Sequence, residues 1–254
     1  MAKINVLITG GTSGIGLATI HKFLYELKNE VEIISLSRSE DKIKQALESL
    51  ALAKKQVHFY TTDVSNVASL EKVRASVEAK FSKIDILINN AGNIIAGGVE
   101  GLSFQDWDFS MTNNLSSFFY VTKTFLELLK KSDYPSIVNI SSISSRLSGA
   151  STGYSVAKAG VDMMTKCFAR ELSKYQIRVN SVNPGITKSG FQVHNGLMDE
   201  AGYVRFLEDV TKTYPIGLGE CSDVSELIYY LTSDKARWIT GSTYIIDGGR
   251  SVNI

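Results

Sequence analysis

The chain has 254 residues, 44% of them hydrophobic, which is enough for one α/β domain with a large core. Its 27 Lys and Arg nearly balance its 26 Asp and Glu and are scattered, so nothing indicates a nucleic acid or an anionic membrane as partner. The two cysteines, Cys167 and Cys221, have neither metal-site nor disulfide-framework spacing, and the three histidines show no metal-ligand spacing.

A strand-like segment at residues 4–8 opens the pattern, and no stretch has the hydropathy of a membrane span or the layout of a secretory leader. We therefore expect a cytoplasmic protein in a reducing compartment. We expect no metal ion, no nucleic-acid partner and no membrane partner. The expected partners are a small-molecule substrate and further copies of the chain.

Short aliphatic runs alternate with longer helical patterns through the whole chain, which is typical of βαβ units and a parallel sheet. Several runs lack polar alternation, as expected for strands with helices on both faces. The predicted strands are 4–8, 31–36, 57–61, 84–88, 137–140, 178–182 and 243–246. We predict an α/β fold with a doubly wound parallel sheet of about seven strands, in a single domain over residues 1–254.

A glycine-rich segment at residues 9–16 reads Thr-Gly-Gly-Thr-Ser-Gly-Ile-Gly and lies between the first predicted strand and helix, where a dinucleotide-binding turn must lie. Gly10 allows a tight turn, Gly14 lets the backbone approach a pyrophosphate, and Gly16 lets helix and strand pack closely. Free N–H groups at the helix N-terminus attract the phosphates. The expected cofactor contacts here are Gly10, Ser13, Gly14, Ile15 and Gly16.

The carboxyl end of the second predicted strand distinguishes the two nicotinamide cofactors. An acidic residue there binds the ribose 2′-hydroxyl of NAD, whereas an arginine accommodates the 2′-phosphate of NADP. This chain has Ser37-Arg38 at that position, and the nearest acidic residues lie at the other end of the strand or inside the next helix. Ser37 and Arg38 therefore favour NADP(H) over NAD(H), and the alternative for Arg38 is a solvent-exposed side chain.

A long helix is predicted at residues 154–175, with Tyr154 and Lys158 one turn apart on the same face near its start. A free phenol has a pKa near 10, and an adjacent ammonium favours the phenolate. We expect Lys158 to lower the pKa of Tyr154 towards neutral pH, where general acid–base catalysis is most effective. Alone, such a pair would indicate only a helix-surface contact.

The apolar residues of this helix fill more than one stripe, which indicates burial on more than one side. One side can cover the sheet, and the helical pattern at 104–131 is the predicted neighbour of the other. A core within the chain and a contact between subunits both fit this pattern. A separate segment, residues 186–214, interrupts the α/β alternation with three glycines around an apolar stretch, and we predict a mobile substrate lid there.

Four motifs occur in order along the chain: residues 9–16, Asn89-Asn90-Ala91-Gly92, Ser141-Ser142, and Tyr154 with Lys158. This series resembles the classical short-chain dehydrogenase/reductase family, and the resemblance extends from Ile4 to Gly249, almost the whole chain. It implies a Rossmann-type sheet and hydride transfer between nicotinamide and a carbonyl or alcohol. It also implies that the two long helices pair between subunits, which favours a symmetric dimer or a homotetramer.

The resemblance implies roles for the catalytic residues. Tyr154 would donate a proton to the substrate oxygen, and Lys158 would also bind the nicotinamide ribose. Ser142 rather than Ser141 would hydrogen-bond the carbonyl oxygen, since a strand turns successive side chains to opposite faces. Asn114 would anchor a water that links the lysine to solvent.

Two points in this implied site stay open. Asn113 is the alternative to Asn114, and the helix N-cap is the alternative role for Asp63. The family turn that holds the nicotinamide carboxamide usually has a threonine at the position of Ser189, and here a threonine stands two residues earlier. The cofactor contacts implied after the third, fourth and sixth strands are Asp63, Val64, Asn90, Ala91, Gly92, Pro184, Gly185, Ile186 and Ser189.

The function expected from the motifs is that of an NADPH-dependent carbonyl reductase, reversible as an alcohol dehydrogenase. The alternatives are an NAD-dependent alcohol or steroid dehydrogenase, a 3-oxoacyl-(acyl-carrier-protein) reductase, and a regulator that binds nicotinamide without turnover. The complete Tyr154, Lys158, Ser142 and Asn114 set argues against the regulator. The sequence names no substrate, and both pocket and surface positions fit Arg146 and His194.

Overall fold

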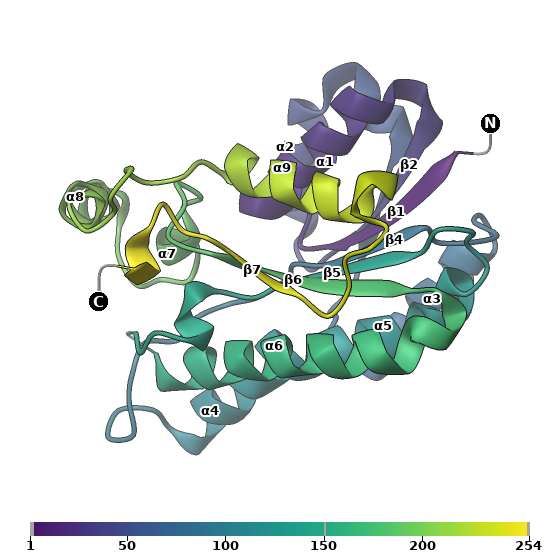
Figure 1. Cartoon of the computed structure of the whole chain (residues 1–254). Helices are drawn as coiled ribbons and strands as arrows, with labels where there is room; N and C mark the ends of the chain where they lie inside the picture. The colour runs from purple at the N-terminus through teal and green to yellow at the C-terminus, as the bar shows by residue number, and fades with distance from the viewer. Residues whose placement is uncertain (1–2, 150, 253–254) are drawn as a thin grey trace.

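The computed structural model describes residues 3–149 and 151–252. Its centre is a seven-stranded parallel sheet in the order β3-β2-β1-β4-β5-β6-β7, with helices on both faces (Figure 1). The strands are β1 Ile4–Thr9, β2 Val31–Ser37, β3 Val57–Thr61, β4 Ile86–Asn89, β5 Ser136–Ile140, β6 Arg178–Pro184 and β7 Thr243–Ile246. This Rossmann-type domain confirms the predicted fold, and every predicted strand is present.

Two helical layers cover the sheet (Figure 1): α1 Gly14–Leu27, α2 Glu40–Ser49 and α9 Cys221–Thr232 lie on one face, and α3 Val67–Glu78, α5 Ser117–Leu129 and α6 Thr152–Leu172 lie on the other. Strand β1 serves both layers. Val6 and Ile8 belong to the core that includes Phe23 of α1, and Leu7 belongs to the core that includes Phe125 of α5. Because alternate residues of a strand face opposite sides, burial of both sides requires a continuous apolar run.

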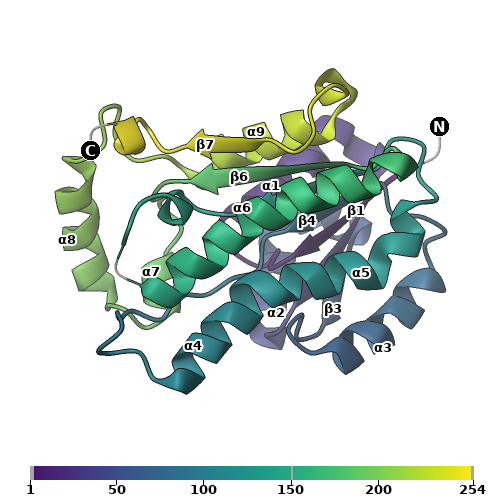
Figure 2. The same cartoon turned by 60° about the horizontal axis from the view of Figure 1, so that its bottom comes forward.

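The helical pattern at 104–131 is not one α-helix. Helix α4 Phe104–Met111 is followed by a π-helical turn at Thr112–Ser116, and α5 begins after it. Helix α6 starts two residues before the predicted position and ends in a 3-10 turn at Ser173–Tyr175. Figure 2 shows α4 and α5 following one another end to end, with α6 alongside them on one face of the molecule.

The segment between β6 and α9 forms α7 Phe191–His194 and α8 Glu200–Thr211, at the end of the sheet where the strands finish (Figure 1). The other 3-10 turns are Lys28–Glu30, Ala51–Gln56, Ile143–Ser145, Asp234–Ala236 and Arg250–Val252. Within the described residues, no helix combines the length and apolar character needed to cross a membrane.

The direction of the strand order changes at β1, which lies between β2 and β4. In open α/β sheets, ligands bind in the crevice beyond the carboxyl ends of the strands at such a point. Thr9 connects the two sides of this crevice, because its hydroxyl oxygen accepts hydrogen bonds from the N–H groups of Asn90 and Ala91, each at 2.9 Å. The glycine-rich turn after β1 is therefore held next to the loop after β4.

Candidate active site

A cleft of about 650 Å³ opens beyond the carboxyl ends of the central strands. The glycine-rich turn and the loops after β2, β4, β5 and β6 form its floor, and α6, α7 and α8 contribute its walls. Most of the predicted site residues line this cleft, and the residues that do so are Gly10, Ser13, Gly14, Ile15, Ser37, Arg38, Val64, Asn90, Ala91, Gly92, Ser142, Tyr154, Lys158, Pro184, Gly185, Ile186 and Ser189.

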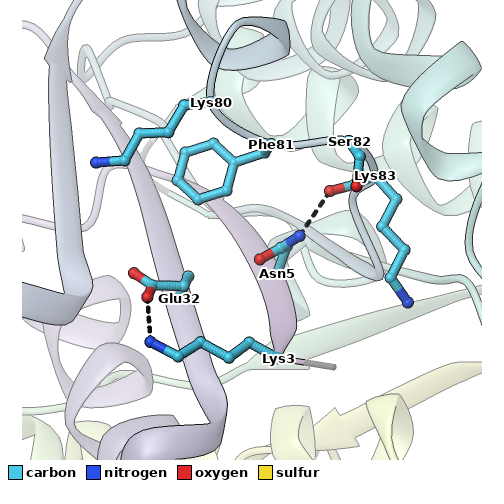
Figure 3. Close-up of a pocket in the computed structure, with 7 residues that line it drawn as sticks. All are labelled: Lys3, Asn5, Glu32, Lys80, Phe81, Ser82 and Lys83. Atoms are coloured by element: carbon cyan, nitrogen blue, oxygen red, sulfur yellow. Dashed lines mark hydrogen bonds and ion pairs between the residues drawn. The ribbon is translucent and has the colours of Figure 1, made fainter. Parts of the chain in front are cut away.

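A second hollow, of about 330 Å³, lies at the amino ends of β1 and β2 (Figure 3). Lys3 pairs there with Glu32 at 2.5 Å, and the Asn5 amide donates to the backbone oxygen of Lys83 at 2.9 Å. These polar groups are engaged with one another, and the hollow contains none of the predicted site residues. The cleft is therefore the candidate active site.

The glycine-rich turn has the backbone geometry that a phosphate-binding turn needs. Gly10 has a φ of +70°, a conformation that residues with a Cβ rarely adopt. A Cβ on Gly16 would lie 2.2 Å from the backbone oxygen of Gly10, so any side chain there would push α1 away from the turn. Gly16 therefore acts by close packing and does not itself line the cleft. Ser13 forms the extended N-cap of α1.

The end of the cleft beside β2 carries two positive charges. Arg38 and Lys42 both line it, and Ser39 caps α2 by accepting a hydrogen bond from the N–H of Lys42. Burial lowers the pKa of Lys42, and the neighbouring charge of Arg38 lowers it further. The Ser37 hydroxyl is buried there without a hydrogen-bond partner among the described residues. Lys42 was missed by the sequence analysis, although its spacing of four residues from Arg38 was a usable signal.

The predicted catalytic pair lies deep in the cleft. The hydroxyl of Ser151 caps α6 by accepting from the N–H of Tyr154. The Lys158 side chain is buried, its Nζ donates to the backbone oxygen of Ile140 at 2.8 Å, and it lies 5.6 Å from the centroid of the Tyr154 ring. The end of β5 and the start of α6 thus place both groups together.

The expectation that Lys158 lowers the pKa of Tyr154 is wrong. Burial raises the pKa of Tyr154 to about 12, against a smaller lowering by a hydrogen bond with Ser142. Burial also lowers the pKa of Lys158 to about 7, against a smaller raising by the charge of Asp162. The same poorly solvated surroundings disfavour both the phenolate and the ammonium. The phenol therefore keeps its proton at neutral pH.

The two serines after β5 point to different partners, as strand alternation predicts. The Ser141 hydroxyl donates to the backbone oxygen of Lys158 at 3.0 Å, whereas the Ser142 hydroxyl accepts from the N–H of Ser144 at 3.1 Å; both residues line the cleft. Strand β5 itself ends two residues before Ser142, at Ile140. Ser142 is thus the serine hydroxyl placed beside Tyr154.

A buried amide holds the backbone around Ser142. The Asn183 side chain on β6 donates to the backbone oxygen of Ser142 at 3.1 Å, to the Ser145 hydroxyl at 2.9 Å and to the Asp162 carboxylate at 2.9 Å. Asp162 lies one turn beyond Lys158 on α6. This network ties the turn after β5 to α6 and brings a carboxylate near the lysine, and no sequence motif indicated it.

The structure distinguishes the two candidate asparagines. Asn114 is fully buried in the π-helical turn, where its Oδ1 accepts from the N–H of Asn93 at 3.0 Å and its amide donates to the backbone oxygen of Ser110 at 3.0 Å. A Cβ on Gly92 would lie 2.9 Å from the Asn114 Oδ1 and 3.7 Å from the Lys158 Nζ, so the lack of a side chain at Gly92 leaves room for both polar groups. The Asn113 amide instead donates to the backbone oxygen of Phe109.

The remaining candidate residues lie as follows. The Asp63 carboxylate accepts from the N–H and hydroxyl of Ser65, and the N-cap of α3 is Asn66, so the N-cap alternative for Asp63 is wrong and its cofactor contact stays a prediction. Asn114 does not line the cleft, and its expected role as the anchor of a water stays a prediction. Arg146 is exposed outside the cleft, whereas His194 lines it.

The predicted lid forms the outer wall of the cleft. The ring of Phe191 on α7 lies 6.3 Å from the ring of Tyr154, centroid to centroid. Apolar side chains dominate the rest of this wall, namely Leu197, Met198, Phe206 and Val210. The Tyr214 hydroxyl anchors the base of the segment by accepting from the N–H of Ile186 at 2.8 Å.

Comparison with known proteins identifies the class. The model of the short chain dehydrogenase family matches residues 4–199, so the chain belongs to this family. It is 32% identical to 3-oxoacyl-(acyl-carrier-protein) reductase FabG of Chlamydia pneumoniae, over 96% of this chain and 95% of that protein. It is 31% identical to the NADP-dependent (R)-specific alcohol dehydrogenase of Lentilactobacillus kefiri, over 96% of this chain and 94% of that protein.

Similar solved structures support the same family assignment. A variant of actinorhodin polyketide ketoreductase with NADPH has a TM-score of 0.89 and 29% identity over 100% of both chains. ElxO with NADP bound has a TM-score of 0.86 and 29% identity over 99% of this chain and 100% of that chain. The protein is therefore an oxidoreductase of the short-chain dehydrogenase family that acts on CH–OH or C=O groups with a nicotinamide cofactor.

Proposed function

We propose that the protein is an NADPH-dependent carbonyl reductase that reduces a small-molecule ketone and acts in reverse as an alcohol dehydrogenase. The observation that carries this proposal is a single cleft with Tyr154, Lys158 and Ser142 in its depth and Arg38 and Lys42 at its β2 end. The NADP-dependent alcohol dehydrogenase relative and the NADP-bound structural neighbours support it.

The residues present fit such a cofactor. Gly10 and Gly14 line the turn after β1 without side chains, where a pyrophosphate would approach the start of α1. The orphaned Ser37 hydroxyl and two cations at the β2 end suit a phosphate, which accepts charge-assisted hydrogen bonds. Of the described residues, no Asp or Glu lines the cleft, so no carboxylate is placed there for a ribose 2′-hydroxyl. These features support NADP(H) over NAD(H).

When bound, the nicotinamide supplies or accepts the hydride. The chain's own residues handle the proton and the charge on the substrate oxygen. Tyr154 stays protonated at neutral pH because burial raises its pKa to about 12, and its phenol donates the proton to the oxygen as hydride reaches the carbon. The Ser142 hydroxyl donates a second hydrogen bond, which stabilises negative charge as it develops there.

Lys158 contributes a positive charge beside the phenol. With a pKa near 7, it is about half protonated at neutral pH, and Asp162 favours the protonated form. We propose that this ammonium offsets the negative charge left on Tyr154 after proton transfer and binds the nicotinamide ribose. Asn114 supports the same corner from behind Gly92.

We also propose that the protein works as a symmetric dimer or homotetramer. Helices α4, α5 and α6 lie on one face of the molecule (Figure 2). They leave large apolar side chains in solvent, including Phe104 at 89% and Met163 at 59% exposure. Exposed apolar surface can mark protein–protein contacts. Both cysteines are free thiols, which supports the proposed cytoplasmic location.

A second candidate is reduction of 3-oxoacyl groups on acyl carrier protein. The relatives with that printed function from Chlamydia pneumoniae and Thermotoga maritima, each 32% identical, favour it. It uses the same catalytic residues, and only the substrate distinguishes it from the first.

The proposal is tested by NADPH oxidation with a panel of ketones, diketones, sugars, steroids and acyl thioesters. At least one ketone should be reduced by the wild-type protein. Tyr154→Phe should nearly abolish turnover while leaving the Kd for NADPH almost unchanged, because the lost interaction acts on the transition state. Retention of most of the wild-type rate by this variant would contradict the role of Tyr154 as proton donor.

A further inference from the structure

The charged residues that line the cleft are all basic. Its basic lining residues are Arg38 and Lys42 beside β2, Lys158 in α6 and Arg250 beside the lid, and its described residues include no acidic one. The proposed function employs the first three. Arg250 has no role in it, although its position in the cleft exposes any bound substrate to its charge.

The fold holds Arg250 beside the lid. β7 is followed by a tight turn in which the Asp247 carboxylate accepts from the N–H of Gly249 at 3.0 Å and from that of Ser251 at 2.7 Å. The turn starts the short helix Arg250–Val252, which lies next to α8 in both Figure 1 and Figure 2. The Asp247 oxygens are engaged by backbone N–H groups of the turn.

Tyr214 lies within electrostatic reach of this turn. Burial raises the pKa of the Tyr214 phenol, a hydrogen bond from the N–H of Ile186 and the positive charge of Arg250 lower it, and the negative charge of Asp247 raises it. Tyr214 lines the cleft at the base of the lid, and its ring packs against the position of Gly185 after β6. Arg250 lines the same cleft as Tyr214, whereas Asp247 does not line it and its carboxylate accepts from backbone N–H groups of the turn.

This part of the cleft is otherwise apolar with one polar edge. Gln192 and His194 on α7 add polar groups to the apolar lid side chains. The Oε1 of Gln192 is buried without a hydrogen-bond partner among the described residues. A pocket with a few convergent polar groups in an apolar lining selects a ligand with polar groups at matching positions.

We infer that the substrate is a carbonyl compound with a carboxylate, and that Arg250 binds this carboxylate while Tyr154 and Ser142 hold the carbonyl oxygen. The inference rests on the proposed function. A guanidinium binds a carboxylate through two parallel hydrogen bonds, so one arginine matches one monoanion. The dianionic phosphate proposed at the other end of the cleft faces two cations, Arg38 and Lys42. A single cation in an apolar pocket therefore favours a carboxylate over a phosphate.

The test compares ketones that carry a carboxylate with their methyl esters, which match them in shape but lack the charge. The wild-type protein should reduce the better keto acid with a kcat/KM at least about tenfold above that of its ester. Arg250→Met should lower kcat/KM for the acid by about 10–100-fold, leave the ester within about threefold, and leave the Kd for NADPH unchanged. Arg237→Met is the control, because Arg237 is exposed outside the cleft.

Calorimetry adds a readout that does not need turnover. Binding of a keto acid to the NADP-loaded protein should be lost in Arg250→Met and retained in Arg237→Met. An equal loss for acid and ester, a preference for the ester, or a weakened Kd for NADPH in Arg250→Met would overturn the inference. Reduction of neutral ketones alone would overturn it and leave the proposed function intact. Arg250-dependent acid binding without any carbonyl reduction would instead contradict the proposed function.

Discussion

Replacing Lys42 with alanine tests whether Lys42 binds the phosphate of NADPH or is only a surface residue. Arg38 is exposed, so its contribution to phosphate binding is screened and stands at the low end for a charge-assisted contact, about 1.5 kcal/mol or about tenfold in affinity. Lys42 is partly buried beside Arg38, and a unit charge about 4 Å from an anion in watery surroundings adds about 1 kcal/mol, or about fivefold. We therefore expect NADPH to bind at least about tenfold more tightly than NADH.

Variants of the two basic residues should lose affinity for NADPH but not for NADH. Arg38→Ala should weaken NADPH binding about tenfold and Lys42→Ala about fivefold, with little change for NADH. The control is Lys44→Ala, because Lys44 is exposed on the same helix and pairs with Asp41 at 3.7 Å, outside the cleft. Raising the salt concentration should shrink the preference for NADPH, since exposed charges are screened.

Isothermal calorimetry with both cofactors is the assay. Equal binding of NADPH and NADH by the wild-type protein would refute the NADP assignment. A loss in Lys42→Ala that is the same for both cofactors, or that is matched by Lys44→Ala, would refute the role of Lys42. The two losses should not be strictly additive, because Arg38 and Lys42 repel each other and removal of either relieves the other.

Three further predictions concern the buried pair and the assembly. Burial lowers the folded-state pKa of Lys158 from 10.5 to about 7, so the folded protein is destabilised fully below about pH 7, and this destabilisation fades towards pH 10.5. Lys158→Met should therefore raise Tm at pH 7 with little gain at pH 10. A lower Tm at pH 7 would contradict this. Asp162→Asn removes the charge that raises the Lys158 pKa, so the alkaline limb of the pH profile of kcat/KM should move to lower pH, and an unmoved limb would exclude this coupling. Light scattering should show a dimer or tetramer that Met163→Asp weakens. Val204→Asp on α8 is the control and should not weaken it, since both residues are exposed but only Met163 lies on the α4–α6 face. A monomeric wild-type protein would refute the interface.

Local sequence patterns predicted the fold closely. Runs such as residues 57–61 and 243–246 became strands with the predicted ends, although both are edge strands and are only partly buried. The break in the helical pattern at 104–131 was not predictable in this way. Within the π-helical turn at Thr112–Ser116, the Asn114 side chain hydrogen-bonds to Asn93, which comes from another part of the chain.

The sequence alone determined which chemical groups are present and in which local secondary structure each lies. Gly10 lies in a turn after a strand, Tyr154 and Lys158 lie on one face of a helix, and Arg38 follows the end of β2. Spacing suffices for these features because neighbours in a turn or helix have fixed geometry. Protonation and charge placement were decided by the tertiary structure. The pKa values of Tyr154 and Lys158 follow from burial by segments distant in sequence, and Arg250 reaches the cleft only because β7 ends beside the lid. Desolvation and long-range electrostatics depend on everything that surrounds a group, which no local pattern records.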